Sequence, residues 1–193
     1  MNTAEILKEA VSALRAGGVI LYPTDTVWGI GCDATRPEAV AKVFAIKRRS
    51  EAKSLVLLAS DLDMVARYVK QIPNIAIDLV EVNDKPMTLI YPGALQGPYG
   101  LAENAVAEDG SVGIRIPLPG FWRDLVARLG RPLVSTSANM SGEPTPRRFS
   151  EIPEEIRTAV DYCVPAPLER GSTGSASQII KLGLGGEVEI IRA

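Results

Sequence analysis

The chain has 193 residues, a length typical of one domain, with 46% hydrophobic residues, 23% charged residues and a formal charge of −2. It contains no histidine, which excludes Ser-His-Asp and Cys-His catalytic groups and every metal site that needs an imidazole ligand. Its two cysteines, Cys32 and Cys163, form no C-x-x-C motif and are expected to be unreactive thiols in a reducing cytoplasm.

Targeting segments are not apparent in the sequence. No run approaches the roughly 18 apolar residues of a membrane span, and Glu5, Lys8 and Glu9 interrupt residues 1–16 where an apolar leader would lie. We therefore expect a cytoplasmic protein that makes no membrane contact and folds as a single domain over residues 1–193.

Apolar periodicity in the first half of the chain predicts helices alternating with buried strands. Thr3 is expected to cap the first helix, and Ser60 with Asp63 suggests a capping box for the third. A loop rich in hydroxyls and glycine is expected from Thr24 to Cys32. Helices are predicted over 3–16, from about 35 to 46, from 60 to about 69 and over 73–82, and strands over 19–22, 54–59 and 87–91.

The second half continues the alternation after a long loop punctuated by Gly and Pro at residues 92–110. The predicted strands are too apolar for a sheet with one face in water, so helices should cover both faces. The pattern indicates an α/β fold with a twisted open mixed sheet and helices on both sides. Strands are predicted over 111–116, 132–135, 161–164, 177–182 and 188–192, and helices over 120–129 and near 150–160.

The loop after the first strand is the first candidate site. Hydroxyls that follow a buried strand are well placed for a ligand, because ligands of open α/β sheets bind at strand ends. Gly29, Gly31 and Ala34 imitate a dinucleotide-binding fingerprint, but Pro37 starts the helix only after the glycines, which disfavours that interpretation. A plain glycine turn remains the alternative.

A basic segment from Lys42 to Lys53 holds five cations and one acid, Glu51, and is the second candidate. Arginine and lysine side by side suit phosphate, since arginine offers a bidentate fork and lysine a point charge. The alternative is favourable placement of cations at a helix C-terminus, with the side chains in solvent. The sequence leaves both open.

Two further segments concentrate hydroxyls, residues 135–142 and residues 171–177. Such loops can grip phosphates or a small polar substrate, although Ser and Thr also cap their own turns. The second segment lacks the lysine of a Walker phosphate loop. Arg115 lies between apolar residues in Gly113–Pro117, so it is expected to need an anionic partner.

The order of these motifs resembles the YrdC-like family, the threonylcarbamoyl-AMP synthases, in its short, single-domain bacterial form. The similarity runs from about residue 5 to the C-terminus. Its motifs here are Tyr22-Pro23-Thr24-Asp25-Thr26, Gly29-Ile30-Gly31, Lys47-Arg48-Arg49, Lys85-Pro86-Met87-Thr88, Gly113-Ile114-Arg115-Ile116-Pro117, Ser135-Thr136-Ser137-Ala138-Asn139-Met140-Ser141-Gly142 and Ile190-Ile191-Arg192.

The resemblance implies an enzyme that joins L-threonine, bicarbonate or CO2 and ATP, with Mg²⁺, into threonylcarbamoyl-AMP and pyrophosphate. It also implies a concave substrate groove on a YrdC-like fold. The product would serve threonylcarbamoyladenosine modification of tRNA, through downstream proteins that transfer the threonylcarbamoyl group. The sequence identifies no protein ligand for the metal.

The resemblance also carries functional residues onto this chain, position by position. Lys47 and Arg49 match the K-x-R pair and are the predicted catalytic residues, which also bind ATP. Trp28 stands where the family commonly has tyrosine or phenylalanine. The remaining ATP-binding residues are Ser137, Asn139 and Arg192, and the residues expected at threonine or the carbamate are Thr24, Thr26, Ser111, Ser135 and Ser177.

Two other functions fit parts of the sequence. The basic segment, with Arg147 and Arg148, would suit an RNA-binding module without turnover or weak RNA binding beside the enzyme activity. The overall negative charge and the 5% aromatic content disfavour a dedicated RNA-binding protein. A carbamoyl-transfer maturation domain shares the fold but normally belongs to a much longer chain.

Overall fold

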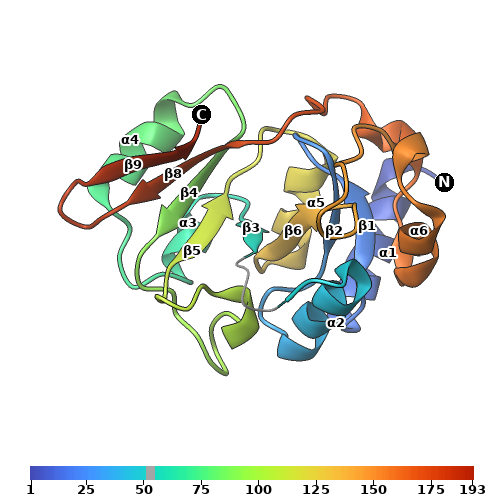
Figure 1. Cartoon of the computed structure of the whole chain (residues 1–193), viewed down its shortest axis with the longest axis horizontal. Coiled ribbons are helices and arrows are strands. Elements are labelled where there is room, and N and C mark those ends of the chain that lie inside the picture. The colour runs from blue at the N-terminus through green and yellow to red at the C-terminus, as the bar shows by residue number, and fades with distance from the viewer. Residues whose placement is uncertain (51–54) are drawn as a thin grey trace.

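A nine-stranded mixed sheet runs through the protein, whose computed structural model describes residues 1–50 and 55–193 (Figure 1). The strand order is β7-β1-β2-β6-β3-β5-β4-β8-β9. The predicted α/β class with a mixed sheet is therefore confirmed. The strands are β1 (Ile20–Pro23), β2 (Trp28–Gly31), β3 (Val56–Leu58), β4 (Met87–Tyr91), β5 (Val112–Arg115), β6 (Leu133–Ser137), β7 (Tyr162–Cys163), β8 (Gln178–Leu182) and β9 (Val188–Arg192).

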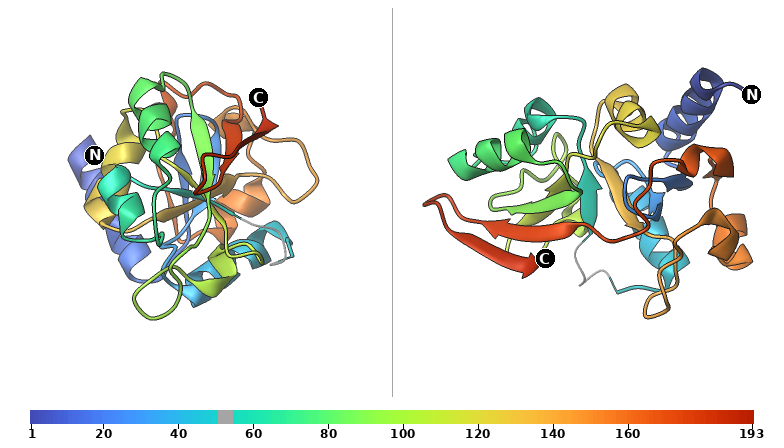
Figure 2. Two further views of the ribbon diagram at one scale, coloured as in Figure 1. Left: turned by 90° about the vertical axis from the view of Figure 1, so that its left-hand side faces the viewer. Right: turned by 90° about the horizontal axis from the view of Figure 1, so that it is seen from above.

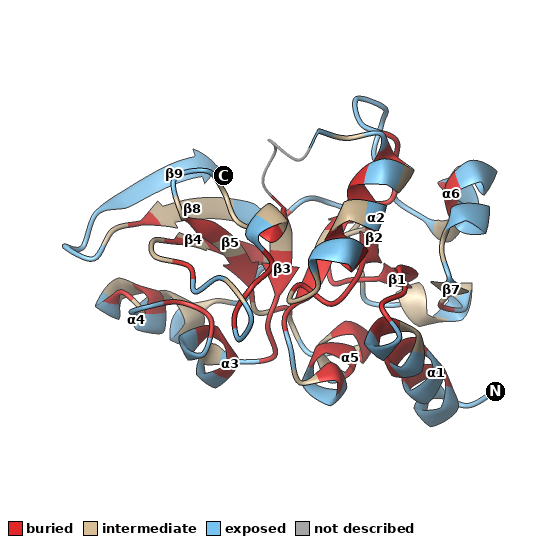
Figure 3. Cartoon of the chain, turned by 90° about the horizontal axis from the view of Figure 1, so that it is seen from below, coloured by how far each residue is buried: buried red, intermediate tan, exposed pale blue. Residues whose placement is uncertain are grey.

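Helices cover both faces of the sheet, as predicted. One face carries α1, α5, α3 and α4 in a row, whereas α2 and α6 lie on the other face toward the β1 end (Figures 2 and 3). The helices are α1 (Thr3–Arg15), α2 (Pro37–Lys47), α3 (Leu62–Ala66), α4 (Asn74–Val82), α5 (Phe121–Leu129) and α6 (Glu154–Ala159), with short 3-10 turns at Glu103–Ala105, Phe149–Glu151 and Ala166–Glu169.

The hydrophobic core follows from the apolar patterns of the sequence. The stripe of α1, from Ile6 to Leu14, is buried against α5 and the sheet. Residues Ile20 to Pro23 are all buried, as expected for a strand covered on both faces. Packing of these long apolar runs fixes the central strands and leaves polar residues at the strand ends.

The two helix caps were assigned one residue away from their observed positions. Asn2, not Thr3, caps α1: its side chain accepts from the Glu5 N–H at 2.9 Å, and the Glu5 carboxylate accepts from the Asn2 N–H. Asp61, not Ser60, caps α3, which ends at Ala66 instead of near residue 69. In both cases a longer side chain one position away reaches the free N–H groups.

The predicted loop from Thr24 to Cys32 contains strand β2, so that expectation was wrong. β2 pairs antiparallel with β1, with Leu21 opposite Ile30, and also with β6. Gly31 permits this pairing, because a Cβ there would lie 2.2 Å from the Val134 carbonyl oxygen. In β2, a glycine that looks like a turn residue in the sequence instead allows neighbouring strands to approach closely.

Strand β6 extends to Ser137, two residues beyond its predicted end. Ser135 and Ser137 therefore lie on a strand and not in a loop. The predicted strand over 54–59 is observed as Val56–Leu58, while Ser54 lies outside the described residues. The first part of the hydroxyl-rich segment is thus held rigidly by the sheet.

Candidate active site

A cavity of about 560 Å³ opens where β2 begins and where β5, β6 and β9 end. Its described lining residues include four arginines and seven hydroxyl side chains but no aspartate or glutamate. Such a lining favours an anionic ligand rich in oxygen atoms. The four arginines are Arg49, Arg115, Arg147 and Arg192, and the hydroxyl residues are Thr26, Ser135, Thr136, Ser137, Thr145, Ser175 and Ser177.

Arg115 at the end of β5 forms a buried ion pair, which confirms the prediction that it needs an anionic partner. Its Nη1 donates to Asp25 Oδ1 at 2.8 Å and to Thr26 Oγ1 at 3.0 Å. The second Asp25 oxygen accepts from the Leu118 N–H. The side chains are only 4% and 1% exposed. Asp25 therefore fixes the position of the guanidinium group at the cavity.

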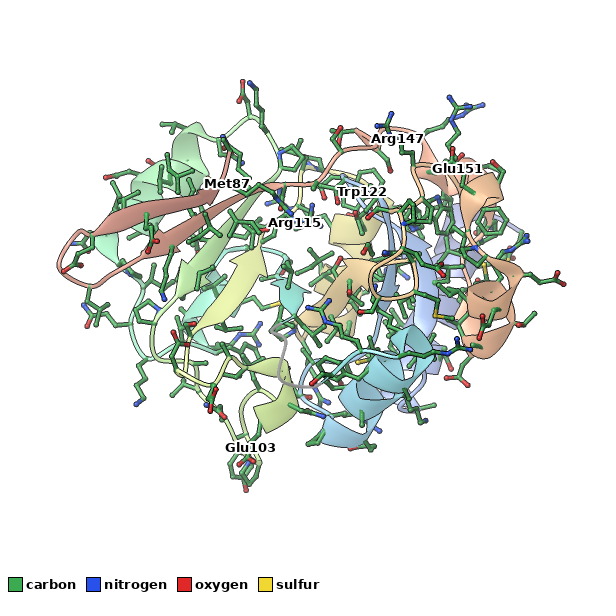
Figure 4. All side chains as sticks on the ribbon, viewed as in Figure 1. Met87, Glu103, Arg115, Trp122, Arg147 and Glu151 are labelled. Carbon is green, nitrogen blue, oxygen red and sulfur yellow. The ribbon has the colours of Figure 1, made fainter. Side chains whose placement is uncertain are left out.

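Burial shapes the electrostatics of the Arg115 guanidinium. Burial lowers the pKa of Arg115, and the neighbouring Asp25 opposes that change. Its buried Nε has no hydrogen-bond partner among the described residues. Figure 4 shows Arg115 near the middle of the molecule and Arg147 on a loop near its rim. A buried donor without a partner is uncommon in folded proteins.

Thr24 and Thr26 occupy different positions in the turn between β1 and β2. Thr26 lines the cavity, but Thr24 does not. The Thr24 hydroxyl lies 2.9 Å from Thr26 Oγ1 and donates to the Val27 carbonyl oxygen at 2.7 Å. Thr24 therefore shapes the turn from behind and supports Thr26.

The K-x-R and S-x-N motifs meet in space, as the family resemblance implies for two motifs that both bind ATP. Lys47 Nζ donates to the Ser137 carbonyl oxygen and, at 3.4 Å, to Asn139 Oδ1. The Ser137 hydroxyl also donates to Asn139 Oδ1, and Arg49 Nη1 lies 3.5 Å from Thr136 Oγ1. Arg49 and Ser137 line the cavity, whereas Lys47 and Asn139 lie behind its wall.

The buried amine of Lys47 gives the folding stability a specific pH dependence. Burial, and then the nearby Arg49 charge, lower the pKa of Lys47 from 10.5 to about 8. Between these two values the unfolded chain keeps the proton and the folded chain releases it, so the free energy of unfolding should rise with pH in this window.

Unfolding by urea at a series of pH values, for the wild type and Lys47→Met, measures this effect. We expect the stability of the wild type relative to Lys47→Met to increase between about pH 8 and about pH 10.5. Other titrating groups are common to both proteins and cancel. If the difference in the free energy of unfolding between the two proteins stayed constant across this pH range, burial would not lower the pKa of Lys47.

Ser135, Ser177 and Arg192 line the cavity, as their predicted roles require. The Ser177 hydroxyl lies 2.8 Å from Thr88 Oγ1. The backbone carbonyl oxygen of Ser177 accepts from Arg192 Nε at 2.8 Å. Ser111 does not join them. It precedes β5, at the opposite end of the strand from Arg115, and its hydroxyl donates to Asp109.

Sequence reasoning did not place Arg147, Thr145 and Ser175 in this site. In the sequence Arg147 stands out only as a cation suited to RNA, and its position eight residues beyond Asn139 gives no sign that the chain returns to the cavity. Thr145 lies between two prolines, and Ser175 belongs to the second hydroxyl-rich segment. The hydroxyl-rich composition of residues 171–177 is the one sequence feature that points to Ser175 as a site residue.

Trp28 forms part of the cavity wall and is held from behind. Its Nε1 donates to Glu169 Oε2 at 2.7 Å, and the same oxygen accepts from the Phe149 N–H at 3.0 Å. The Trp28 and Phe149 rings lie 5.0 Å apart. Trp28 is 1% exposed, so the indole N–H depends on Glu169 for a partner.

Glu169→Ala should therefore lower the free energy of unfolding by about 1–3 kcal/mol, since it leaves the buried indole N–H without an acceptor. Urea unfolding with tryptophan emission as the probe measures the loss. Glu81→Ala, at an exposed position of α4, is the control and should change little. Equal stability of the two variants would contradict the assigned role of Glu169.

Metal ligands are scarce in the described part of the chain. It contains no group of three or more His, Cys, Asp or Glu residues able to hold a metal ion, and the cavity lining described above has no carboxylate. Magnesium in proteins is usually bound by one or two carboxylates together with substrate phosphates. The described residues do not fit a resident magnesium site.

None of the described helices has the length and apolar character of a membrane span.

The fold and the site define an α/β protein with a cationic cavity for an anionic ligand. The model of the Sua5/YciO/YrdC family, described as "Telomere recombination", matches residues 12–193. The chain belongs to this family. The resemblance drawn from the motifs is thus confirmed.

Curated relatives extend the comparison over most of the chain. A threonylcarbamoyl-AMP synthase of Halorhodospira halophila is 32% identical over 163 residues, which are 84% of this chain and 83% of the relative. A threonylcarbamoyl-AMP synthase of Stenotrophomonas maltophilia is 34% identical over 176 residues, 89% of each chain.

Among solved structures, Sua5 of P. abyssi in complex with L-threonine superposes with a TM-score of 0.82 at 24% identity. The alignment covers 94% of this chain but 52% of that one, so this chain spans about half the length of that Sua5. At this level of identity the similarity establishes the fold alone.

Proposed function

We propose that the chain is a threonylcarbamoyl-AMP synthase. It would convert L-threonine, bicarbonate or CO2 and ATP into threonylcarbamoyl-AMP and pyrophosphate, for threonylcarbamoyladenosine modification of tRNA. The enzyme class is the one that the curated relatives carry, at 32% and 34% identity over most of the chain. The substrates follow from that class and from the chemistry of the cavity.

The observation that carries this proposal is the convergence of four arginines and seven hydroxyls on one cavity without a lining carboxylate. ATP and threonine together bring a triphosphate and a carboxylate, so both need cations and hydrogen-bond donors. A volume of about 560 Å³ lies within the usual range for small-molecule sites, roughly 300–1,000 Å³.

The arginines divide by their burial. Arg115 is almost fully buried and is held by Asp25 beside Thr26, and its fixed charge at the cavity suits the small carboxylate of threonine. Arg147 and Arg192 are exposed at the rim and Arg49 is half-buried, which suits the longer triphosphate. Lys47 and Asn139 would hold the Ser137 strand end in place instead of contacting substrate.

The chemistry needs no nucleophile from the protein, which agrees with a chain without histidine. Bicarbonate supplies CO2 by losing hydroxide, and the threonine amine adds to the CO2. The nitrogen releases one proton to solvent, where it combines with the hydroxide, and a carbamate remains. A carbamate oxygen then attacks the α-phosphorus of ATP, and the bond to the leaving pyrophosphate breaks. Arg49, Arg147 and Arg192 would neutralise the phosphate charge, and the fixed Arg115 would orient threonine.

We propose that Mg²⁺ enters with ATP as part of the substrate. The cavity offers hydroxyls but no described carboxylate ligand, so phosphate oxygens and water would complete the coordination. The reaction would take place in the cytoplasm, where downstream tRNA-modifying proteins receive the adenylate.

The experiment measures pyrophosphate release by the purified chain with MgATP, L-threonine and bicarbonate, and with each omitted in turn. We expect release only when all three are present. Arg128 is an exposed arginine on α5 outside the cavity, so Arg128→Ala should retain pyrophosphate release. Tight tRNA binding without pyrophosphate release would favour the RNA-binding module and contradict the proposal.

A further inference from the structure

A second, smaller hollow lies on the face of the sheet that carries α4 (Figure 3). Its volume is about 170 Å³. Alternate residues of a strand point to opposite faces of a sheet. On β4, Leu89 and Tyr91 line the hollow, whereas Thr88 contacts Ser177 of the cavity lining. The hollow and the cavity thus lie on opposite faces of β4, and they share no described lining residue.

The walls of the hollow are mainly apolar. Among its described lining residues, only Asn83, Tyr91 and Arg123 have polar side chains, and none is an acid. The Asn83 amide is already engaged, because its Oδ1 accepts from the Lys85 N–H at 3.3 Å and its Nδ2 donates to the Lys85 carbonyl oxygen. The volume corresponds to about six water molecules. A compact, largely hydrocarbon ligand fits such a space.

Arg123 supplies the only charge among the described lining residues. It is half-buried on α5, and its Nε donates to the Ser60 carbonyl oxygen at 3.0 Å, which holds the guanidinium group in place. It enters none of the ion pairs formed among the described residues. Asp61 does not neutralise it: the pKa of Asp61 is lowered first by the hydrogen bond from the Met64 N–H, and Arg123 makes the smallest contribution. A carboxylate beside Arg123 would gain charge-assisted hydrogen bonds.

Leu118 connects the hollow to the buried ion pair of the cavity. It lines the hollow, and its N–H donates to Asp25 Oδ2 at 3.1 Å. The other Asp25 oxygen accepts from Arg115 Nη1 at 2.8 Å. The Leu118 carbonyl oxygen accepts from Trp122 Nε1 at 2.7 Å. A shift of Leu118 would therefore reach Arg115 through two hydrogen bonds and would also disturb the Trp122 indole.

We propose that the hollow is a second ligand site, which takes a small carboxylic acid with a branched apolar body, and that its occupant acts on Arg115 through Leu118. The apolar body would contact the walls, and the carboxylate would pair with Arg123. A triphosphate is too large and too highly charged for this space. An amino acid fits less well than a simple acid, because no described acid lines the hollow to pair with an ammonium group. The effect on threonine binding rests on the proposed function, whereas the ligand site itself does not.

The first test titrates the full chain, labelled with nitrogen-15, with sodium isovalerate. The chain has two tryptophans, so two indole N–H signals are expected, and Trp122→Phe identifies them. The Trp122 signal should shift saturably, with a Kd of about 1 mM for a ligand of this size. Absence of a saturable shift would overturn the proposal. A shift confined to Trp28, on the cavity wall, would place isovalerate in the cavity and would also overturn it.

The decisive variant is Arg123→Gln, which removes the charge and keeps a hydrogen-bonding amide. Its affinity for isovalerate should fall by about tenfold or more, because hydrogen bonds to a charged group are lost. Isovaleramide, which has the same shape without the charge, should bind the wild type and the variant equally weakly.

The matched control is Arg128→Gln, which removes an exposed arginine of the same helix outside the hollow. It should bind isovalerate like the wild type. Wild-type affinity of Arg123→Gln for isovalerate, or an equal loss of affinity in Arg128→Gln, would each overturn the proposal.

The second test measures threonine binding by calorimetry at increasing isovalerate concentration. The apparent Kd for threonine should change by about fivefold or more and then reach a plateau once the hollow is filled. An apparent Kd that rises in proportion to isovalerate without a plateau would indicate competition in the cavity, and an unchanged Kd would exclude the action on Arg115. Either result overturns the proposal. A chain that binds isovalerate through Arg123 but binds no threonine would contradict the proposed function and support the second site.

Discussion

Replacing Asp25 with alanine should lower the free energy of unfolding by about 3–5 kcal/mol, the usual cost of leaving one partner of a buried ion pair uncompensated. Arg115 is 4% exposed and would keep only Thr26 as its described hydrogen-bond partner. The Leu118 N–H would also lose its acceptor. Equilibrium unfolding in urea, with wild type and variant side by side, measures the change.

An exposed ion pair of the same chain supplies the control. Arg48 and Glu155 are in direct contact, but their side chains are 72% and 56% exposed. Solvent screening limits such pairs to about 0–1 kcal/mol, so Glu155→Ala should change stability little. If Asp25→Ala cost no more than Glu155→Ala, the buried pair would not be the structural anchor of the site.

Replacing Arg49 with alanine should lower kcat/KM for threonylcarbamoyl-AMP formation by about 10²–10³-fold, the range found when one fixed donor to developing charge is removed. Arg49 follows the last turn of α2, is half-buried and lines the cavity. Its loss removes charge at the site while the apolar face of α2 stays packed. Steady-state pyrophosphate release measures the effect.

Arg49→Lys and Arg128→Ala complete this experiment. The lysine variant keeps a point charge without the bidentate fork, so it should fall between wild type and Arg49→Ala. Arg128→Ala should behave as wild type. Circular dichroism and urea unfolding check that Arg49→Ala remains folded. Full activity of the folded alanine variant would show that Arg49 does not contact the reacting phosphates.

Local patterns predicted most of the fold. Helix α1 and strand β1 were found because their apolar residues follow a simple period. Strand β2 is not predicted, because Gly29 and Gly31 look like turn residues in the sequence. The close approach of β6 explains Gly31, where a Cβ would lie 2.2 Å from the Val134 carbonyl oxygen. When two paired strands are far apart in the chain, the residues of one strand do not show that it pairs with the other.

The site was predictable to a similar extent. The family resemblance implied that Arg49, Ser137 and Thr26 would gather at one site, and all three line the cavity. Sequence did not reveal that Lys47 lies behind the cavity wall or that Ser111 lies at the far end of β5. Both positions depend on side-chain direction and strand orientation, which are set by tertiary packing.

The central claim is that this cavity joins threonine, carbon dioxide and ATP. Its most direct test incubates the purified chain with MgATP, L-threonine and carbon-13 bicarbonate and analyses the products by mass spectrometry. We predict an adenylate with the mass of threonylcarbamoyl-AMP carrying one carbon-13 atom, formed with an equal amount of pyrophosphate. Turnover of ATP without any labelled adenylate would contradict the account.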